Sequence, residues 1–384
     1  MTLSSKTALV AVGSASTQVC SVGAFARAES KALENVFNKV FVLEPTKIDK
    51  DIYKYPDFSQ LPEHFSPDVV FFHAPGICDR YFPWSAVVNA IRIRKHFKNA
   101  KFVSVVHEYS EAPWSWKIRQ IILAKISDAL IVNSLADLEG LKKFHSNILR
   151  SRLGPTLYSP ELIHSSIDTL AALIENKKQD LSKRHQLDPQ KKWIVHAGLV
   201  TPGKGVDFLS KITPFLEEDE LLIVMGGFGP KNKDRIFAEK VITSLRESLG
   251  NRFYFLPSPE DSEFKNFLFS ADLVVLPYSE GLSERRSSFL SSMSCGSNVW
   301  TTTGRFSDPM GLLESGTHYI PVDLWLSERT DSSKKVGNSL KHALAEQKEQ
   351  RLARRKKNLL WSKRFSWENR SKEIQDFLLP ATKR

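Results

Sequence analysis

The chain has 384 residues, of which 41% are hydrophobic and 25% are charged, and it carries a formal net charge of +11. This composition is typical of a folded globular protein with two cores, and it excludes a disordered or fibrous chain. The three cysteines are widely spaced, which excludes a disulfide scaffold and a cysteine-based zinc site. The positive charge predicts an affinity for polyanions, namely nucleotide diphosphates, anionic lipids or nucleic acid.

Sequence signals test two possibilities, a protein that binds nucleic acid and a protein that is secreted or spans a membrane. No zinc-finger spacing, aromatic RNA-binding box or recognition-helix signature supports nucleic acid. The first residues lack a basic segment followed by the long apolar run of a secretory signal, and no apolar run approaches about 18 residues. We therefore expect a cytoplasmic protein without a membrane-spanning helix.

The first half alternates apolar strand patterns with helical patterns, which predicts a doubly wound parallel sheet. The first strand, residues 7–13, is followed by a loop of small residues and a helix over about residues 24–36. Gly13 and Ser14 begin that loop, where they either contact a ligand or form an ordinary turn.

A polar cluster follows the strand that ends near residue 106. His107 is either a ligand-contacting residue or a structural histidine bonded to a backbone carbonyl. Glu108 and Glu111 are either acceptor contacts or solvated loop charges. The next helix begins with aromatic and basic residues, which indicate either a solvated basic face or a surface that docks on anionic membrane. These residues are Trp114, Trp116, Lys117 and Arg119, joined by Arg92, Arg94, Lys95 and Lys98 upstream.

The second half repeats the strand, loop, helix pattern. Residues 151–160 contain glycine and two prolines and are expected to cross between domains. The strand that begins at Trp193 leads to a glycine-containing loop with Lys204, whose cationic head near a helix N-terminus suits a diphosphate. Residues 271–276, an apolar run, predict another buried strand, and Glu280 is expected in the loop after it. Ser287 and Ser288 then begin a helix, where free N–H groups favour a phosphate.

The second half also resembles the retaining GT-B glycosyltransferases of family 4. These enzymes have a loop in which a proline precedes a Glu-Gly pair, followed by a helix of small residues. The matching residues are Pro277, Glu280, Gly281, Met293, Ser294, Cys295, Gly296, Val299 and Thr301 to Thr303. The resemblance covers residues 193–304 well and the rest loosely. It departs at Ser288, where the family has a second glutamate, and at Leu199, where it has an arginine that binds the diphosphate.

The resemblance implies an α/β protein of GT-B type, with two Rossmann-like doubly wound domains facing across a cleft. It implies that Glu280 and His107 contact the donor sugar and that, with Lys204, they are the catalytic residues. The expected diphosphate ligands are Lys204, Gly205, Ser287 and Ser288, joined by Arg285 and Arg286 as candidate substitutes for the arginine missing at position 199; either both act, or one acts and the other pairs with Glu284. The expected base neighbours are Leu256, Pro257 and Ser258, and either Glu284 contacts the ribose in place of the missing glutamate or the ribose is held differently. The implied acceptor side is Gly13, Ser14, Glu108 and Glu111.

The predicted reaction moves a sugar from a nucleoside diphosphate sugar to a hydroxyl of a glycan or lipid-linked acceptor, with retention, in cell-surface polysaccharide or glycolipid synthesis. No cofactor is expected, and no metal, because no Asp-x-Asp motif lies in the expected cleft loops.

The expected boundaries are an acceptor domain over 1–158, a linker and helix over 159–192, a donor domain over 193–360, and a helix over 361–384 that returns to the first domain. The basic run 351–357 is either a solvated face or a contact with anionic lipid on the cytoplasmic side of a membrane. Two alternatives stay open: a non-catalytic GT-B scaffold that binds a nucleotide or partner, and a basic protein that binds membrane or nucleic acid.

Overall fold

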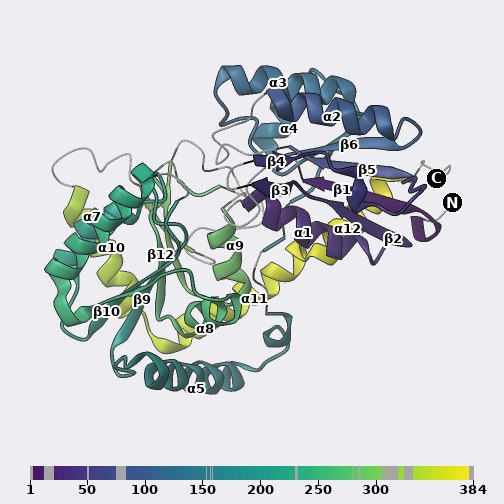
Figure 1. Cartoon of the computed structure of the whole chain (residues 1–384). Coiled ribbons are helices and arrows are strands. Elements are labelled where there is room, and N and C mark those ends of the chain that lie inside the picture. Colours follow the sequence, from purple (N-terminus) through teal and green to yellow (C-terminus); the bar gives the residue numbers. More distant parts are fainter. Residues whose placement is uncertain are drawn as a thin grey trace. The chain divides into compact units, whose positions relative to one another are not determined.

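The computed structural model describes residues 3–12, 21–49, 52–74, 84–152, 154–155, 157, 159–229, 232–279, 281–283, 286–304, 307, 319–323 and 332–379. The chain divides into two compact units, Met1–Thr156 with Phe365–Arg384, and Leu157–Arg364. Each unit contains a six-stranded parallel sheet (Figure 1). No helix of the described residues combines the length and the apolar character needed to cross a membrane.

The sheet of the first unit has the strand order β2-β1-β5-β6-β7-β8, and a two-stranded antiparallel ribbon, β3-β4, accompanies it. The strands are β1 (Thr7–Val12), β2 (Lys39–Leu43), β3 (Thr46–Asp49), β4 (Ile52–Lys54), β5 (Val69–His73), β6 (Lys101–Val106), β7 (Ala129–Val132) and β8 (Ile148–Arg150). The helices are α1 (Ser21–Leu33), α2 (Trp84–His96), α3 (Trp114–Ile126), α4 (Leu135–Leu141) and α12 (Trp367–Leu378).

Successive residues of β1 serve two cores, because side chains alternate between the faces of a strand. Leu9 and Ala11 pack in the layer of α2 and α3, whereas Ala8 and Val10 pack in the layer of α1 and α12. Figure 1 shows these two pairs of helices on opposite faces of the sheet. Ile374 of α12 belongs to the second core, so the C-terminal helix completes the unit in which the chain begins.

The sheet of the second unit has the order β11-β10-β9-β12-β13-β14. Its strands are β9 (Lys192–Ala197), β10 (Glu220–Met225), β11 (Phe253–Leu256), β12 (Leu273–Leu276), β13 (Val299–Thr303) and β14 (Tyr319–Asp323). Its helices are α5 (Ile167–His185), α6 (Leu209–Ile212), α7 (Asn232–Leu249), α8 (Asp261–Ser270), α9 (Ser287–Ser294), α10 (Ser332–Ala345) and α11 (Lys348–Ser362).

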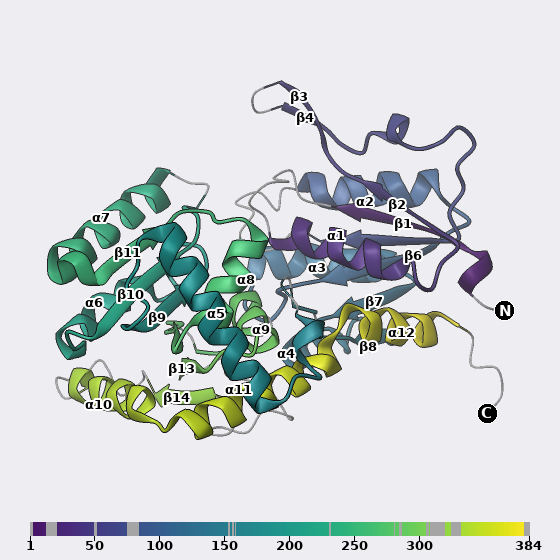
Figure 2. The ribbon, with the colours of Figure 1, turned by 90° about the horizontal axis from the view of Figure 1, so that it is seen from below.

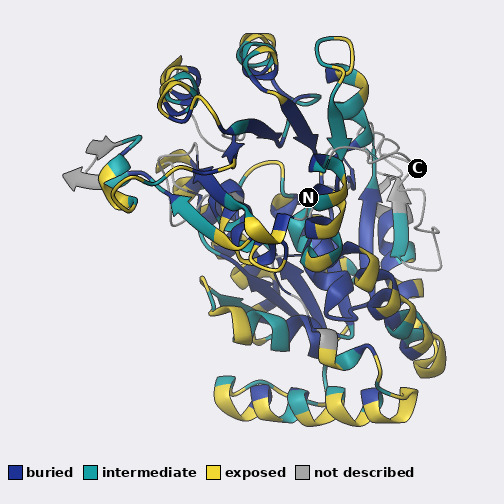
Figure 3. Ribbon diagram, turned by 90° about the vertical axis from the view of Figure 1, so that its right-hand side faces the viewer, coloured by how far each residue is buried: buried dark blue, intermediate teal, exposed yellow. Residues whose placement is uncertain are grey.

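Helices cover both faces of this second sheet (Figure 2). Residues of α6, α7 and α10 share one core with Ile194, Leu222 and Val224 of the strands. On the other face, Trp193 stacks on Phe267 of α8 at a centroid distance of 5.7 Å. The central strands β9, β10, β12 and β13 are therefore almost entirely buried and the edge strand β11 partly so, while the outer faces of the helices are exposed (Figure 3). Long apolar runs predicted these strands because both faces of a parallel sheet are covered.

Helix α5, which the sequence placed in a segment between domains, belongs to the second unit. It contacts α8 and α11, and Leu170 is fully buried in the small core that these helices share. Lys178 of α5 donates to Asp272 at 2.9 Å and to the carbonyl of Lys191 at 2.8 Å. One buried lysine thus links a mostly polar helix to the residues that directly precede the central strands β9 and β12.

Candidate active site in the second unit

The second sheet changes its winding direction between β9 and β12. The chain leaves β9 for β10 and β11 on one side, then returns to place β12 on the other side. In open α/β sheets, ligands bind outside the carboxyl ends of the strands at such a switch point. The loop after β9 carries Lys204 and the loop after β12 begins at Pro277, so Lys204 and the described start of the predicted Glu280 loop lie at the carboxyl ends of neighbouring strands.

The loop after β9 packs directly on the loop after β12. Gly205 has a φ of +76°, and a Cβ atom there would lie 1.7 Å from the carbonyl oxygen of Pro277. Ser279 Oγ donates to the carbonyl of Gly203 at 3.2 Å. Lys204 is half-buried between these two glycines. The backbone contact therefore requires glycine at position 205, next to the lysine whose charge the sequence singled out.

The loop after β10 closes against the loop after β9 in the same way. Gly226 has a φ of +149°, and a Cβ atom there would lie 1.8 Å from the carbonyl oxygen of Gly198. The N–H of Gly226 donates to the carbonyl of Leu256 at 3.1 Å. Ser258 lies beside Gly227 and has a φ of +45°. The predicted base neighbours, Leu256 to Ser258, therefore lie in the same row of loops, two strands from Lys204.

Helix α9 begins at the same edge. Its N-cap is Arg286, whose side chain makes no capping hydrogen bond within the described part of the chain. The Arg286 guanidinium lies 4.9 Å from the ring centre of Tyr278, a cation–π contact. The Tyr278 hydroxyl lies 2.7 Å from Ser288 Oγ and hydrogen-bonds the backbone of Phe289. Burial raises the pKa of Tyr278 to about 12, so the hydroxyl stays protonated.

Ser288 therefore differs chemically from the glutamate that the family resemblance implies at this position. The Ser288 hydroxyl hydrogen-bonds with Tyr278. It also lies close to Gly198: a Cβ atom added there would be in van der Waals contact with Ser288 Oγ, at 3.7 Å. A glutamate would bring a charge and two more carbons into this contact. The small serine instead lets α9 approach the loop after β9 closely.

Several predicted residues lie outside the described residues: Glu280, Glu284 and Arg285 in the loop after β12, and Gly13 and Ser14 after β1. Both sides of the β12 loop are nevertheless fixed. The N–H of Leu282 donates to the carbonyl of Thr302 at 2.8 Å, and Thr302 Oγ1 donates to the carbonyl of Tyr278 at 2.5 Å. The chain around position 280 is thus bound to β13.

His196 is a residue at this edge that the sequence analysis missed. It is fully buried in β9, and one ring nitrogen, Nδ1, lies 2.9 Å from the carbonyl of Val275. Because a carbonyl only accepts, Nδ1 carries the proton and Nε2 is an acceptor. Burial lowers the pKa of His196 to about 4, and the charge of Lys204 adds to this. The signal in the sequence was a single polar residue inside an apolar strand.

In the first unit, His107 belongs to a chain of buried polar groups. Its Nε2 lies 3.2 Å from His73 Nδ1, and its Nδ1 lies 3.0 Å from the amide nitrogen of Asn133. His73 Nε2 lies 3.6 Å from Glu29 Oε1, and Arg370 Nε of α12 donates to Glu29 Oε2 at 2.7 Å. All five side chains are at most 4% exposed. We call these five residues the buried relay.

The hydrogen bonds of the buried relay define which nitrogens carry protons. Asn133 Nδ2 also donates to the carbonyl of Val106 at 3.4 Å, which orients the amide nitrogen toward His107. His107 Nδ1 therefore accepts, and its Nε2–H donates to His73 Nδ1. The proton of His73 is then on Nε2, the nitrogen that faces Glu29. Both ring nitrogens of His107 are thus engaged by side chains within the unit.

This geometry differs from the structural option for His107, because both ring nitrogens contact side chains and not a backbone carbonyl. The contact of His107 with a ligand stays a prediction. Contact with a sugar through a ring nitrogen requires the buried relay to rearrange. Glu108 and Glu111 are half-buried in the following loop. That loop is fixed to α4, because the N–H of Ser110 donates to buried Asp137 at 2.7 Å.

No model of a known protein family matches the chain. No curated protein matches its sequence. Solved structures do match it in shape over nearly its whole length. Anabaena HepE, solved with UDP and glucose, is 13% identical with a TM-score of 0.67, covering 97% of this chain and 99% of that one.

Two further structures agree. Sucrose-phosphate synthase from Thermosynechococcus elongatus is 14% identical with a TM-score of 0.66, covering 97% of this chain and 98% of that one. WaaG, a glycosyltransferase involved in lipopolysaccharide biosynthesis, is 14% identical with a TM-score of 0.61, covering 97% and 100%. The fold is GT-B. The predicted fold class, with two Rossmann-like α/β units, is confirmed, and at these identities the likeness establishes the fold alone.

The buried relay predicts the result of replacing Arg370 with Met. Burial, and then the positive charge of Arg370, lower the pKa of His73 to about 3, so this imidazole is neutral near pH 7. Without Arg370, the Glu29 carboxylate loses its cation and the pKa of His73 rises. Ring nitrogen NMR between about pH 8 and 4 should show His73 as a neutral Nε2–H tautomer in the wild type, and protonation of His73 should begin at a higher pH in Arg370→Met, because burial still lowers its pKa but the charge of Arg370 no longer does.

Arg364→Met is the control, because Arg364 is exposed and lies outside the buried relay. It should leave both histidine signals unchanged. Histidine spectra of a folded Arg370→Met protein that match the wild type across this pH range would contradict the predicted coupling.

His196 predicts a pH dependence of stability. Its folded pKa of about 4 lies below the ordinary value, so the unfolded chain binds more protons and stability falls as the pH drops from about 6.5 toward 4. Asparagine at this position can still donate to the Val275 carbonyl but cannot titrate. Between pH 7 and 5, the free energy of unfolding in urea should fall by about 2 kcal/mol less in His196→Asn than in the wild type. Equal losses in the two proteins would show that His196 does not titrate on unfolding.

Proposed function

We propose that the chain is a glycosyltransferase that uses a nucleoside diphosphate sugar. One observation supports this proposal most directly. At the carboxyl ends of β9 and β12, where the second sheet changes its winding direction, the loop that contains Lys204 packs against the start of α9. A lysine and a helix N-terminus together favour a diphosphate, through charge and through unbonded N–H groups. The structures of HepE with UDP, glucose and UDP-glucose support a sugar nucleotide as the donor class.

In this proposal, Lys204 and the N–H groups of Ser287 and Ser288 hold the diphosphate. Arg286, held over the Tyr278 ring, supplies the charge that the family places at position 199, and Gly205 allows the close approach. Arg285 is a further candidate for the same role. Glu280 orients the donor sugar, Glu284 contacts the ribose, and residues 256–258 lie beside the base.

The proposed reaction retains the anomeric configuration and uses no metal or cofactor. The bond from the sugar to the diphosphate oxygen breaks, and the acceptor oxygen bonds to the same carbon on the same face. The leaving phosphate takes the proton of the acceptor hydroxyl. Cations around the diphosphate stabilise the negative charge that grows on it, a contribution of the oxyanion-hole type. His107 is the proposed contact to the donor sugar, and Glu108 and Glu111 with Gly13 and Ser14 are the proposed residues on the acceptor side.

Replacing Lys204 with Met tests the donor site. The loss of one charge-assisted contact should weaken nucleoside diphosphate binding by about 1.5–3 kcal/mol, which is about ten- to a hundredfold. Ligand-observed NMR with UDP-, GDP- and ADP-sugars measures this and identifies the donor. Lys211→Met is the matched control, since Lys211 lies on α6 and stacks on Phe208 instead.

Glu280→Ala in the same assay separates the sugar from the nucleotide. We expect it to lose contacts to the sugar and keep those to the nucleotide. If no sugar nucleotide binds to the folded wild type, the non-catalytic scaffold replaces the transferase as the better account.

We also propose that the first unit contacts an anionic membrane, which suits a lipid-linked acceptor. Large apolar side chains are exposed on two neighbouring helices: Trp84 and Val88 of α2 at 55% and 43%, and Trp114 and Ile118 of α3 at 72% and 39%. Arg119 of α3 lies over the Trp84 ring at 5.5 Å, so the two helices form one surface. We call this surface the tryptophan face.

Its charge is one-sided. Helices α2 and α3 contain no Asp or Glu, but they contain three cations each, namely Arg92, Arg94 and Lys95, and Lys117, Arg119 and Lys125. Exposed tryptophans bordered by cations fit the interface of an anionic bilayer, where each cation contributes about 1 kcal/mol. Arg94 is not expected to contribute in this way, because it forms a bidentate ion pair with Asp128.

Co-sedimentation with vesicles tests the tryptophan face. Trp84→Ser with Trp114→Ser should reduce binding to phosphatidylglycerol-containing vesicles by about tenfold or more, because two aromatic anchors are removed. Leu173→Ser with Ile236→Ser is the control, since both residues are exposed apolar residues of the second unit. Binding to pure phosphatidylcholine should be weak for every protein. Equal losses in both double variants would remove the tryptophan face as the membrane contact.

A further inference from the structure

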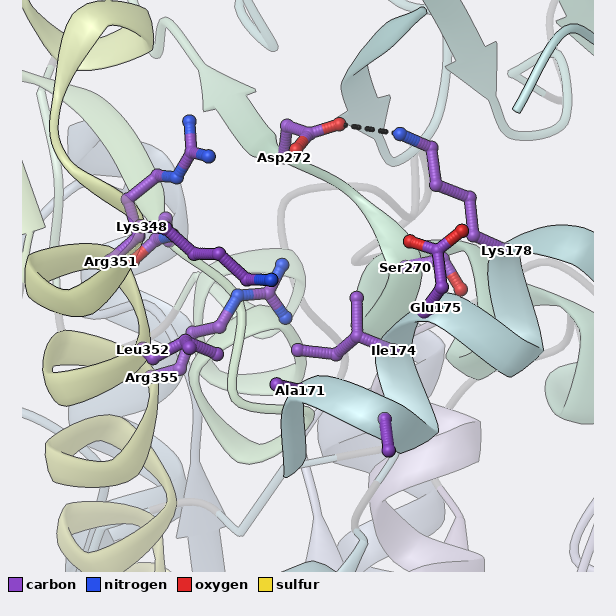
Figure 4. A pocket seen from close by; sticks show the side chains of 12 residues that line it. Ala171, Ile174, Glu175, Lys178, Ser270, Asp272, Lys348, Arg351, Leu352 and Arg355 are labelled. Atoms are coloured by element: carbon purple, nitrogen blue, oxygen red, sulfur yellow. Dashed lines mark hydrogen bonds and ion pairs between the residues drawn. The ribbon is translucent and has the colours of Figure 1, made fainter. Parts of the chain in front are cut away.

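A cavity of about 370 Å³ lies in the second unit, away from the proposed donor site. It is bounded by α5, by α11 and by the residues that immediately precede β12 and β13, including Asp272 and Asn298 (Figure 4). These residues are at the amino ends of the strands, whereas the donor loops follow the carboxyl ends. The cavity is therefore a separate place in the unit, and its size is within the range of small-molecule sites.

Three cations of α11 line the cavity. Lys348, Arg351 and Arg355 are spaced by three and four residues, which places them on one face of the helix. Figure 4 shows their side chains extending from α11 on one side of the cavity. Among the described residues, no carboxylate lies within ion-pair distance of any of the three. The side of the cavity formed by α11 thus carries positive charge without a counterion.

The acidic residues of the cavity do not neutralise this charge. Asp272 is paired with Lys178 at 2.9 Å, and it also accepts from the backbone of Trp193. Glu175 accepts from Gln179 of its own helix at 3.0 Å. Three cations close together in a cavity repel one another and favour an anion between them.

Arg355 is the most buried of the three cations. Burial lowers its pKa to about 10; of the two nearby charges, Asp272 raises this pKa and Arg351 lowers it by less. Its guanidinium is held in place by the carbonyl of Phe269 at 2.7 Å and by the carbonyl of Ala271. The deepest cation of the cavity is thus fixed before any ligand binds.

Neutral polar groups line the same cavity. Ser270 and Asn298 are each 1% exposed, and neither the hydroxyl of Ser270 nor the amide of Asn298 has a hydrogen-bond partner among the described residues. Buried polar groups without partners are costly, and native proteins rarely leave them so. Ile174 and Leu352 add an apolar wall. The cavity therefore combines cations, hydroxyl-binding groups and a small apolar surface.

We propose that this cavity binds a phosphorylated sugar. The phosphate lies on the α11 side, against Lys348, Arg351 and Arg355, and the sugar hydroxyls lie toward Asn298 and the carboxylate of Glu175. This inference does not depend on the proposed glycosyl transfer, because none of these residues belongs to the donor loops.

Calorimetry with glucose 6-phosphate, inorganic phosphate and glucose tests the proposal, with each ligand measured without UDP and again with saturating UDP, which occupies a donor site. We expect glucose 6-phosphate to bind, inorganic phosphate to bind more weakly and glucose not to bind. Lys348→Gln with Arg351→Gln should weaken glucose 6-phosphate binding by about tenfold or more. Arg355 is left unchanged because it holds the end of α8.

Lys240→Gln with Lys357→Gln is the matched control, because it removes two exposed cations of the same unit that do not line the cavity. It should bind glucose 6-phosphate like the wild type. Three results would overturn the proposal: no binding to the folded wild type, equal weakening in both double variants, or binding that UDP abolishes. The last result would assign the sugar phosphate to the donor loops.

Discussion

Close backbone contact between loops is the constraint on which the second unit depends. The loops after β9, β10 and β12 approach so closely that a Cβ atom at Gly205 or Gly226 would overlap a carbonyl oxygen of the neighbouring loop. Both glycines also have positive φ angles, which other residues adopt at a cost. Any side chain there would separate the loops, and Lys204 would move relative to the start of α9. The chemistry proposed for this edge therefore rests on two positions that have no side chain.

The buried charges depend instead on long side chains, which contact residues that are far away in the sequence. Arg370 pairs with Glu29, 341 residues earlier, and through it adjoins His73 and His107. In the second unit, the basic run of α11 is partly used for internal contacts. Arg355 donates to carbonyls at the end of α8, and Lys356 donates to the carbonyl of Ser165 at 2.6 Å. The formal charge of +11 thus overstates the charge that a polyanion meets at the surface.

The sequence predicted what depends on local pattern. Apolar runs such as residues 220–225 predicted buried strands, and the Lys204-Gly205 pair marked a loop whose glycine the structure requires. It could not predict partners that only the fold brings together. His107 was singled out, but His73 was missed: it is the one polar residue of an apolar strand, yet its partners Glu29 and His107 lie 44 and 34 residues away in the sequence. The run at 351–357 offered a solvated face or a lipid contact, and the internal carbonyls that bind it lie about 80 and 190 residues away.

The first unit is discontinuous in sequence, and this affects the order in which a ribosome can supply its parts. The second unit, Leu157–Arg364, is synthesised as one stretch. Helix α12 emerges only after it, and until then Glu29 has no Arg370 and the core around β1 lacks Ile374. The unit that begins the chain is therefore the last to complete its core. During the synthesis of the second unit, the nascent chain therefore has Glu29 without its arginine, and one apolar face of its first sheet is covered by α1 but not yet by α12.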